Sequence, residues 1–507
     1  MKWSQLKVGA ILSYVALFLN IIISLIYTPF MLRTLGQAEY GVLSLALSLV
    51  SNLAILDLGF GNAIIRYTTK YAVEKAVEKE KTLHFMFVIL YTLIGFVSFI
   101  IGCIIIVNME NIFNANLTYE EIDLARKLMI VGVISISISF PLGIFGAIIQ
   151  AYQRHIFIKL LNAIKVIIMP VVLVLTLIGG FRSLGIMIGT LVITLIFNLI
   201  DVYYFYRRLN KRIYITKLDF SLFKSIGTYS FFVFLNIIIS KLYWATDQII
   251  IGMYSGSVAV SVYSIGAQFN NYFMRFSTSL SGLFLPKIVE LNTSSRDNKS
   301  LSELFVKVGR LQILLLTLVL SGFFIFGKEF ITIWAGIAYK EAYYVAMIVM
   351  VTALIPLSQN IGIGIIQAKK LHAFRSISFL FIAIFNIVLS IILVKPYGIV
   401  GCAIATGIAN ILGQGLLMNF YYKHKVGLDI TAYWQGLFRI LVPVVILVAI
   451  NHVINLLIIT DSYKMLFMKI IIFTIEYCIV LWLFSMNRNE KNMIVIPIRK
   501  ILGKSAV

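Results

Sequence analysis

Long runs of apolar residues alternate with short polar segments along almost the whole chain. Each apolar run is close to the roughly 20 residues that a helix needs to cross the hydrocarbon core of a bilayer, and about 14 such runs can be distinguished. The pattern therefore predicts an all-α integral membrane protein with about 14 transmembrane helices. The runs begin near Val8, Gly41, Leu83, Leu128, Ile158, Leu184, Gly227, Ser257, Gly309, Ala342, Ser376, Gly398, Trp434 and Met465.

The composition leaves little room for a soluble domain. Hydrophobic residues make up 60% of the 507 residues, which is more than a water-soluble core can use. The longest connecting segments, 108–127 and 286–310, hold about 20 to 25 residues and carry no cluster of catalytic carboxylates or histidines. An integral-membrane polymerase or glycosyltransferase would need such a cluster. We therefore expect no enzymatic activity, no cofactor and no bound metal.

The distribution of the basic residues decides what the net charge of +22 means. If the N-terminus is cytoplasmic, the internal segments hold about 30 of the Lys and Arg residues and the external segments about 8. The main basic clusters, at 66–81, 207–224, 287–310 and 488–504, then all lie on one side. The positive-inside rule thus predicts an inner (plasma) membrane protein with both termini in the cytoplasm, and it removes the need for a nucleic-acid partner.

The chain also contains an internal repeat, with a shift of about 216 residues. The segment 18–24 recurs letter for letter at 234–240, 148–155 resembles 365–372, and 184–190 resembles 400–406. The first six predicted helices therefore correspond to the next six. Because six is even, both copies enter the membrane from the same side, and the copies should be related by a pseudo-two-fold axis along the membrane normal.

This repeat predicts three parts of the chain. Residues 1–210 form an N-terminal six-helix bundle, residues 211–425 form a second six-helix bundle, and residues 426–507 add helices 13 and 14 with a basic cytoplasmic tail. In transporters built from two such repeats, the substrate site lies between the bundles and opens alternately to each side. The alternative class, a purely structural membrane scaffold, is disfavoured because it would not need charged residues inside the two corresponding bundles.

Three segments resemble the polysaccharide flippases, of the O-antigen type, within the multidrug/oligosaccharidyl-lipid/polysaccharide exporter superfamily. They are Leu32 to Gly41, Leu56 to Gly61 with Arg66 following, and Gly252 to Tyr263. The resemblance implies that an undecaprenyl-pyrophosphate-linked oligosaccharide is loaded in the cytosol and released outside, for surface polysaccharide such as lipopolysaccharide O-antigen. It also implies lipid-linked oligosaccharide, membrane lipids and the polysaccharide polymerase machinery as partners. The alternative within the superfamily is a multidrug exporter coupled to an ion gradient.

Cations inside the predicted spans are the main candidates for substrate contact. Lys165, Lys241 and Arg275 lie within spans 5, 7 and 8, where charge is costly unless it faces a partner or a wet cavity. A diphosphate would bind to such cations. The alternative is that they pair with an Asp of a neighbouring helix or extend to the interface. Lys241 stands out because its partner in the repeat is Leu25.

Polar and aromatic residues on spans 7 and 8 are candidates for contact with the saccharide. The same residue types also anchor helices at interfaces and bond helix to helix, and that alternative stays open. A cationic drug would instead require carboxylates in the cavity, and the acidic residues of the spans lie toward span ends or in span 14. The predicted substrate-binding residues are Lys241, Arg275, Lys165, Asn236, Tyr243, Trp244, Gln268 and Asn271.

Overall fold

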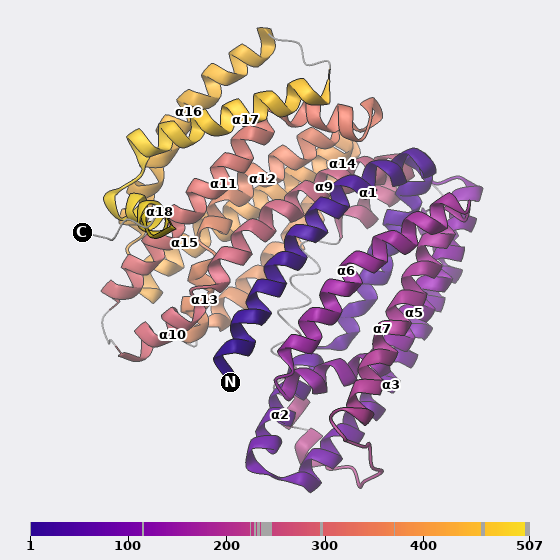
Figure 1. Cartoon of the computed structure of the whole chain (residues 1–507). Helices are drawn as coiled ribbons and strands as arrows, with labels where there is room; N and C mark the ends of the chain where they lie inside the picture. Colours follow the sequence, from indigo (N-terminus) through magenta and orange to yellow (C-terminus); the bar gives the residue numbers. More distant parts are fainter. Residues whose placement is uncertain are drawn as a thin grey trace. The chain divides into compact units, whose positions relative to one another are not determined.

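The structure is a computed structural model, which describes residues 2–501 apart from 114–115, 224, 228–229, 231–233, 235–245, 295–297, 370 and 458–461. The described residues form helices and connecting turns and include no strand (Figure 1). A helix satisfies its own backbone donors and acceptors, as a segment surrounded by lipid requires. The prediction of an all-α membrane protein is confirmed.

The chain divides into two compact units, 1–264 with 391–402 and 265–390 with 403–507. The long helices α9 and α14 contribute to both units, so the boundary between the units reflects contacts in space and does not follow the order of the chain. The predicted division into 1–210, 211–425 and 426–507 is not tested by it and stays a prediction. The N-terminal helices are α1 (Lys2–Leu53), η1 (Ala54–Asp57), α2 (Phe60–Glu74), α3 (Val77–Val107), α4 (Met109–Phe113), α5 (Tyr119–Ala151), α6 (His155–Ile178) and α7 (Arg182–Arg207). They are followed by α9 (Asp247–Gly282), α10 (Leu285–Ser294), α11 (Lys299–Trp334), η2 (Ile337–Tyr339), α12 (Ala342–Ser358), α13 (Ile361–Ala368) and α14 (His372–Ala409). The last are η3 (Asn410–Leu417), α15 (Met418–Tyr421), η4 (Tyr422–Val426), α16 (Ile430–Leu457), α17 (Tyr463–Val480), η5 (Leu481–Ser485) and α18 (Arg488–Ile501).

Eleven helical segments among the described residues are long and apolar enough to cross a membrane. Two of them, Phe18–Glu74 and Ala373–Val426, contain 57 and 54 residues, more than twice the roughly 20 residues of one span. Each of these two segments can therefore supply two predicted spans. Most of the predicted seventh span, which begins near Gly227, lies outside the described residues. The total of about 14 spans stays a prediction.

Two of the long helices are interrupted at equivalent glycines, where one predicted span passes into the next. Gly36 in α1 has φ 78° and ψ 173°, and Gly256 in α9 has φ 82° and ψ −178°. Only glycine adopts this backbone conformation readily. The two residues are 220 positions apart, close to the shift of the sequence repeat, so the two copies use the same joint between consecutive spans.

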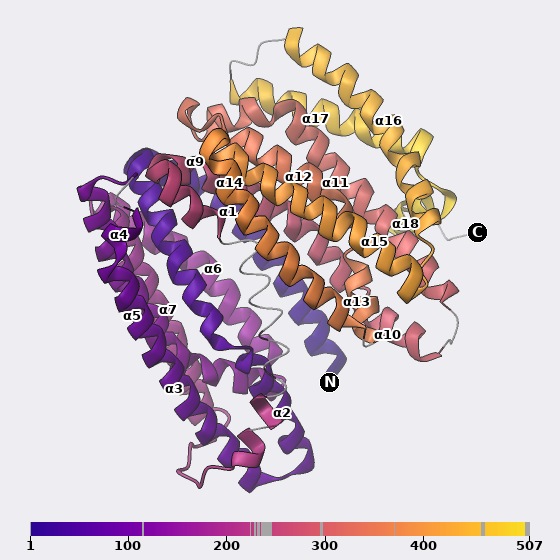
Figure 2. The same cartoon turned by 180° about the vertical axis from the view of Figure 1, so that it is seen from behind.

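In the N-terminal unit, α3, α5 and α7 lie side by side (Figures 1 and 2). Small residues allow a close approach of α3 to α5. A Cβ atom on Gly95 would lie 2.5 Å from the carbonyl oxygen of Ser137, and one on Gly102 would lie 2.5 Å from the side chain of Val133. Membrane helices associate through such small-residue contacts because lipid supplies no hydrophobic drive between them.

In the other unit, α11 packs against α12, α16 and α17. Gly309 of α11 lies under the ring of Tyr433 of α16, which donates or accepts a hydrogen bond with Ser358 at the end of α12. The outer faces of α16 and α17 carry exposed Val445, Ile446, Phe467 and Ile475. Side chains of this kind are what a helix presents to lipid.

The segment that joins the two predicted bundles is fastened to the N-terminal unit. Lys211 donates a hydrogen bond of 2.8 Å to Glu80 at the start of α3, and Glu80, which is 5% exposed, also accepts from the Tyr152 hydroxyl. Burial and the carboxylate of Glu80 raise the pKa of Tyr152 to about 12. Burial alone would lower the pKa of Lys211, but the bonds to Glu80 and Tyr152 raise it above its ordinary value. The connection is therefore held by an ion pair.

Candidate functional site

The structure describes four of the eight predicted substrate-binding residues. Lys165, Gln268, Asn271 and Arg275 are described, while the other four lie in 235–245, outside the described residues. Their role therefore stays a prediction. These four are Lys241, Asn236, Tyr243 and Trp244.

Three of the four described residues lie on one side of α9. Gln268, Asn271, Tyr272 and Arg275 are spaced at i, i+3, i+4 and i+7, which places them on a single helical face. Asn271 and Arg275 are exposed, and Gln268 donates a hydrogen bond of 2.6 Å to the Tyr272 hydroxyl. We call these four residues the α9 polar stripe.

The opposite face of α9 is packed against α11 and α12. The ring of Phe269 lies 5.1 Å from that of Phe323 and 5.5 Å from that of Trp334, centroid to centroid. Farther along α9, the Ser277 hydroxyl donates to the Leu357 carbonyl at 2.6 Å, and fully buried Gln312 donates to the Ser277 carbonyl at 3.1 Å. These contacts set the rotation of α9 and so decide which residues form the polar stripe.

The exposed polar character of this stripe indicates contact with water. An arginine inside a lipid-facing span is costly unless it reaches the interface, and the exposed faces of α16 and α17 are apolar. Among the candidate spans of the described residues, α9 has the lowest mean hydropathy. We therefore identify the α9 polar stripe as the candidate lining of an aqueous pathway.

Lys165 has a different environment, between α6 and α7. Its side chain is half-buried, and its Nζ atom lies 5.7 Å from the centroid of the Phe197 ring. It also interacts electrostatically with Asp201, one turn farther along α7. This attraction supports the alternative that the sequence left open, in which Lys165 is oriented toward an Asp of the neighbouring helix.

The acidic residues of the spans that the sequence singled out have partners within their own unit. Tyr91 donates a hydrogen bond of 2.6 Å to Asp57, Tyr263 donates to Asp247, and Asn451 donates to Glu476 at 2.9 Å. Tyrosine and asparagine donors satisfy a carboxylate without neutralising its charge. Among the described residues, no group of three or more His, Cys, Asp and Glu could hold a metal ion.

The segments that carry the family resemblance form joints between helices. Glu39 accepts from the Arg182 guanidinium at 2.6 Å and from the backbone amide of Ser183 at 2.9 Å, which connects α1 to the start of α7. Gly41 approaches the carbonyl of Ser257 so closely that a Cβ atom would lie 1.9 Å from its oxygen. These motif residues thus position helices, and the structure gives them no direct role in binding.

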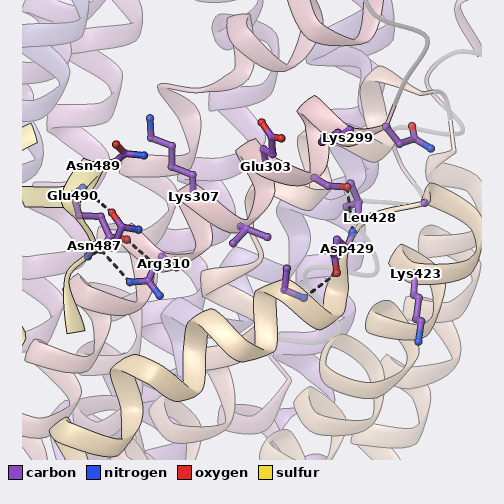
Figure 3. Close-up of a pocket in the computed structure, with 15 residues that line it drawn as sticks. Lys299, Glu303, Lys307, Arg310, Lys423, Leu428, Asp429, Asn487, Asn489 and Glu490 are labelled. Atoms are coloured by element: carbon purple, nitrogen blue, oxygen red, sulfur yellow. Dashed lines mark hydrogen bonds and ion pairs between the residues drawn. The ribbon is translucent and has the colours of Figure 1, made fainter. Parts of the chain in front are cut away.

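A polar pocket of about 940 Å³ lies in the second unit, between the start of α11 and the segments around α16 and α18 (Figure 3). Its lining includes four cations and three carboxylates, so the charges nearly balance. Asp429 accepts from the amide of Ala432 at the start of α16 and is held there. The charged lining residues are Lys299, Lys307, Arg310, Lys423, Glu303, Asp429 and Glu490.

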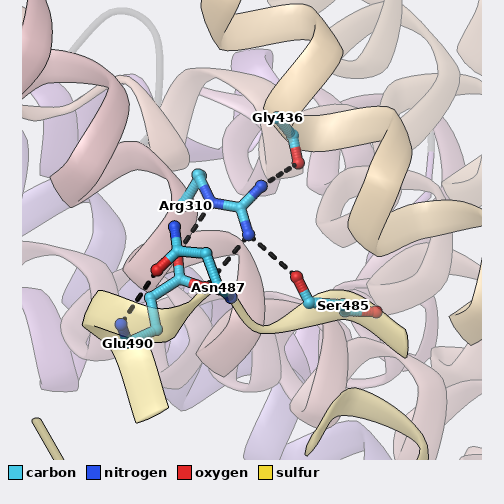
Figure 4. Close-up of polar contacts among 5 residues, drawn as sticks. All are labelled: Arg310, Gly436, Ser485, Asn487 and Glu490. Atoms are coloured by element: carbon cyan, nitrogen blue, oxygen red, sulfur yellow. Dashed lines mark hydrogen bonds and ion pairs between the residues drawn. The ribbon is translucent and has the colours of Figure 1, made fainter. Parts of the chain in front are cut away.

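One wall of this pocket is an ion pair that joins α11 to α18 (Figure 4). The side chains of Arg310 and Glu490 are 9% and 3% exposed, and two hydrogen bonds of 2.7 and 3.0 Å connect them. Arg310 also donates to the carbonyls of Gly436 and Ser485 at 2.8 and 2.9 Å. Asn487 and Glu490 exchange bonds at the start of α18, in the pattern of a capping box.

This ion pair was not predicted, because Arg310 lies in the basic cluster 287–310, where a cytoplasmic surface position was expected. A signal was available in the spacing of Asn487 and Glu490, since a residue that caps a helix followed three positions later by Glu is typical of a helix start. Nothing in the sequence, however, indicates that a glutamate 180 residues away neutralises Arg310.

The fold is shared with solved transporters. A structure titled "Lipid II flippase MurJ, inward closed conformation" matches with a TM-score of 0.74 at 18% identity, covering 93% of this chain and 97% of that chain. An inward-facing multidrug resistance MATE family transporter of the MOP superfamily matches with a TM-score of 0.58 at 15% identity, covering 79% and 93%. A MOP superfamily transporter from Pyrococcus furiosus matches with a TM-score of 0.55 at 14% identity, covering 81% and 94%. No curated protein sequence matches the chain.

The fold is that of a multi-span membrane protein and is the one seen in these solved transporters. The family profile described as "Polysaccharide biosynthesis protein" matches residues 6–292, which is more than half of the chain. The chain belongs to this family of polysaccharide biosynthesis proteins. The resemblance stated from the sequence is thereby confirmed.

Proposed function

We propose that this protein is a flippase that moves an undecaprenyl-pyrophosphate-linked oligosaccharide from the cytoplasmic to the outer leaflet of the inner membrane by alternating access. The α9 polar stripe carries the proposal, because it places an exposed cation, Arg275, beside amide and phenol groups inside a membrane span. A cation binds a diphosphate, and amide and hydroxyl groups bind sugar hydroxyls. Family membership and the fold shared with a lipid II flippase support a lipid-linked substrate.

The finer features of the proposal come from the sequence. Both termini are placed in the cytoplasm by the basic clusters, and the product is assigned to surface polysaccharide such as O-antigen, assembled with a polymerase as partner. Lys241, Asn236, Tyr243 and Trp244 are proposed to complete the binding surface together with Gln268 and Asn271. Lys165 is proposed as a second cation for the diphosphate, in competition with its attraction to Asp201.

The first test is a lipid extraction from cells that lack this protein. We expect the undecaprenyl-pyrophosphate-linked oligosaccharide to accumulate in the cytoplasmic leaflet while surface polysaccharide is lost. An unchanged lipid-linked pool with increased sensitivity to cationic drugs would refute the proposal and would favour the multidrug exporter, the reading that the similarity to MATE transporters also suggests.

The second test asks whether Arg275 acts through its charge. Complementation with Arg275→Gln should restore less than a tenth of wild-type polysaccharide export, whereas Arg275→Lys should retain a substantial part, because a lysine keeps the charge but loses the paired hydrogen bonds. Arg126→Gln is the matched control, since it removes the same charge from an arginine of α5, where Arg126 is bound to Glu110 at 2.9 Å, outside the α9 polar stripe. Normal export by Arg275→Gln at equal protein level would remove Arg275 from the binding surface.

A further inference from the structure

Two adjoining cavities in the N-terminal unit have opposite chemistry. One, of about 570 Å³, is bordered by Tyr71, Glu78, Lys79 and Thr82 and by residues 217–222 and 225. The other, of about 220 Å³, is bordered by α3 side chains and by Leu218, Asp219, Phe220 and Phe223. The two share Leu218, Asp219 and Phe220, so they adjoin along this segment, and we call them together a groove with a polar part and an apolar part.

The apolar part follows α3 into the membrane span. Its α3 side chains are Met86, Ile89, Leu90 and Leu93, and Ile89 and Leu93 are exposed, at 42% and 58%. The polar part begins at Lys79, fourteen residues before Leu93, which corresponds to about 21 Å along a helix. Half of the hydrocarbon core is about 15 Å thick. The groove therefore reaches from the headgroup region well into one leaflet.

The polar part carries a small excess of positive charge. Glu78 is paired with Lys81 at 2.7 Å, and Asp219 accepts hydrogen bonds from Ser221 and from the amide of Leu222 while it attracts Lys79. These bonds hold the pKa of Asp219 below its ordinary value, so the carboxylate stays charged. Lys79 and Lys217 line the polar part together with Glu78 and Asp219, and because Lys81, outside the lining, neutralises Glu78, one lysine charge is left in excess. The hydroxyl group of Thr82 adds a donor for phosphate oxygens.

The segment that closes the groove is held firmly against α3. Leu222 and Ile226 are buried in the same core cluster as Leu83 and Phe87. The hydroxyl groups of Tyr67 and Ser225 lie 2.7 Å apart and share a hydrogen bond. The ion pair of Lys211 with Glu80 fastens the connection just before this segment. The groove is therefore a built feature of the unit.

We propose that this groove binds a phospholipid of the adjacent leaflet with an anionic headgroup, its phosphate beside Lys79 and Lys217 and one acyl chain along Met86 to Leu93. A soluble anion would leave the apolar part empty, and a hydrocarbon chain alone would leave the lysines unused, so only an amphiphile matches both parts. The site is separate from the α9 polar stripe and does not depend on the proposed substrate. A bound lipid would stabilise the connection between the predicted bundles in its docked position.

Native mass spectrometry of the full-length protein tests the headgroup part, with phosphatidylglycerol and phosphatidylcholine as probes. A lysine near a membrane surface contributes about fivefold to the binding of an anionic lipid. We therefore expect wild type to prefer phosphatidylglycerol by about fivefold, Lys217→Gln to lose that preference, and the control Lys159→Gln, on α6, to keep it. Equal binding of the two lipids to wild type, or an equal loss in both variants, would overturn the proposal.

A phosphatidylglycerol with a photoreactive group in one acyl chain tests the apolar part. Cross-links should concentrate on peptides from 86–93 and 218–223, and Leu93→Trp, which fills the groove, should remove them. Labelling spread evenly over the lipid-facing helices, or unchanged in Leu93→Trp, would show annular lipid only and would overturn the proposed site.

Discussion

Replacing Glu490 by glutamine removes one charge of a buried pair while preserving shape and the cap of α18. In the wild type the carboxylate faces Arg310 through two hydrogen bonds, and both side chains are at most 9% exposed. In Glu490→Gln the guanidinium keeps its hydrogen bonds to the carbonyls of Gly436 and Ser485 but loses the carboxylate and one of the two bonds to residue 490. Removing one partner of a buried ion pair costs about 3 to 5 kcal/mol, because the remaining charge is left without compensation. Since glutamine still accepts one bond, we expect a loss near 3 kcal/mol.

Unfolding in mixed micelles of mild detergent and SDS measures this loss as a free energy. The labelling of fully buried Cys402 by a thiol-reactive dye gives a second readout. Arg126→Gln is the control, because its pair with Glu110 has side chains that are 28% and 49% exposed, and such pairs contribute about 0 to 1 kcal/mol. The double variant Arg310→Met with Glu490→Gln should recover part of the loss, since it leaves no unpaired charge.

The reasoning would be refuted if Glu490→Gln lost no more stability than Arg126→Gln. It would also be refuted if the double variant lost at least as much stability as Arg310→Met and Glu490→Gln lose when their separate losses are added. The two side chains would then not stabilise each other.

Four further predictions follow from other contacts. Gly41→Ala should fail to accumulate as folded protein, because its Cβ would lie 1.9 Å from the Ser257 oxygen, whereas Gly143→Ala, with nothing within 4 Å, should accumulate normally; fluorescence size-exclusion chromatography compares them. Lys165→Met should lower the free energy of unfolding by about 1 to 3 kcal/mol, and the double variant Lys165→Met with Asp201→Asn should lower it less. Normal export by the double variant would show that Lys165 serves only to compensate the charge of Asp201. Glu80→Gln should speed tryptic cleavage within 208–219, and unchanged cleavage would mean that the Lys211 contact does not hold this connection. Because the pKa of Lys211 is raised, the stability that its pair contributes should be fully present below pH about 10.5 and lost only as the pH rises above that value, so the difference between wild type and Lys211→Gln should be constant from pH 7 to 9.

The sequence was sufficient to predict the fold class, because every span in lipid must be apolar and must satisfy its own backbone hydrogen bonds as a helix. Hydropathy located the boundaries near Gly41, Ser257 and Gly398, and the structure has helix interruptions with positive φ at Gly36, Gly256 and Gly398. The repeat was predicted from segments such as 18–24 and 234–240, and the interruptions at Gly36 and Gly256 agree with its shift. Packing within the spans was not predictable, since the apolar faces of α6 and α16 differ little in composition from faces that are buried.

The candidate site was predicted only in part. Gln268, Asn271 and Arg275 were chosen one by one as polar residues of a span, and the structure shows that they share a face with Tyr272. The i, i+3, i+7 spacing was present in the sequence and could have supplied that result. For Lys165 the sequence could not distinguish substrate contact from pairing, because the register of α6 against α7 decides which residue lies near Asp201. The ion pair of Arg310 and Glu490 depends on tertiary contacts between distant segments, which spacing does not encode.

The position of Glu490 has a consequence for synthesis of the protein. Arg310 is made 180 residues before its partner, and chains grow at roughly 5 to 20 residues per second, so α11 exists for roughly 9 to 36 s before its counterion is available. During that interval the guanidinium must be hydrated or held by other groups at the edge of the bilayer. The final position of α11 is then fixed only when α18 is made and Glu490 reaches Arg310.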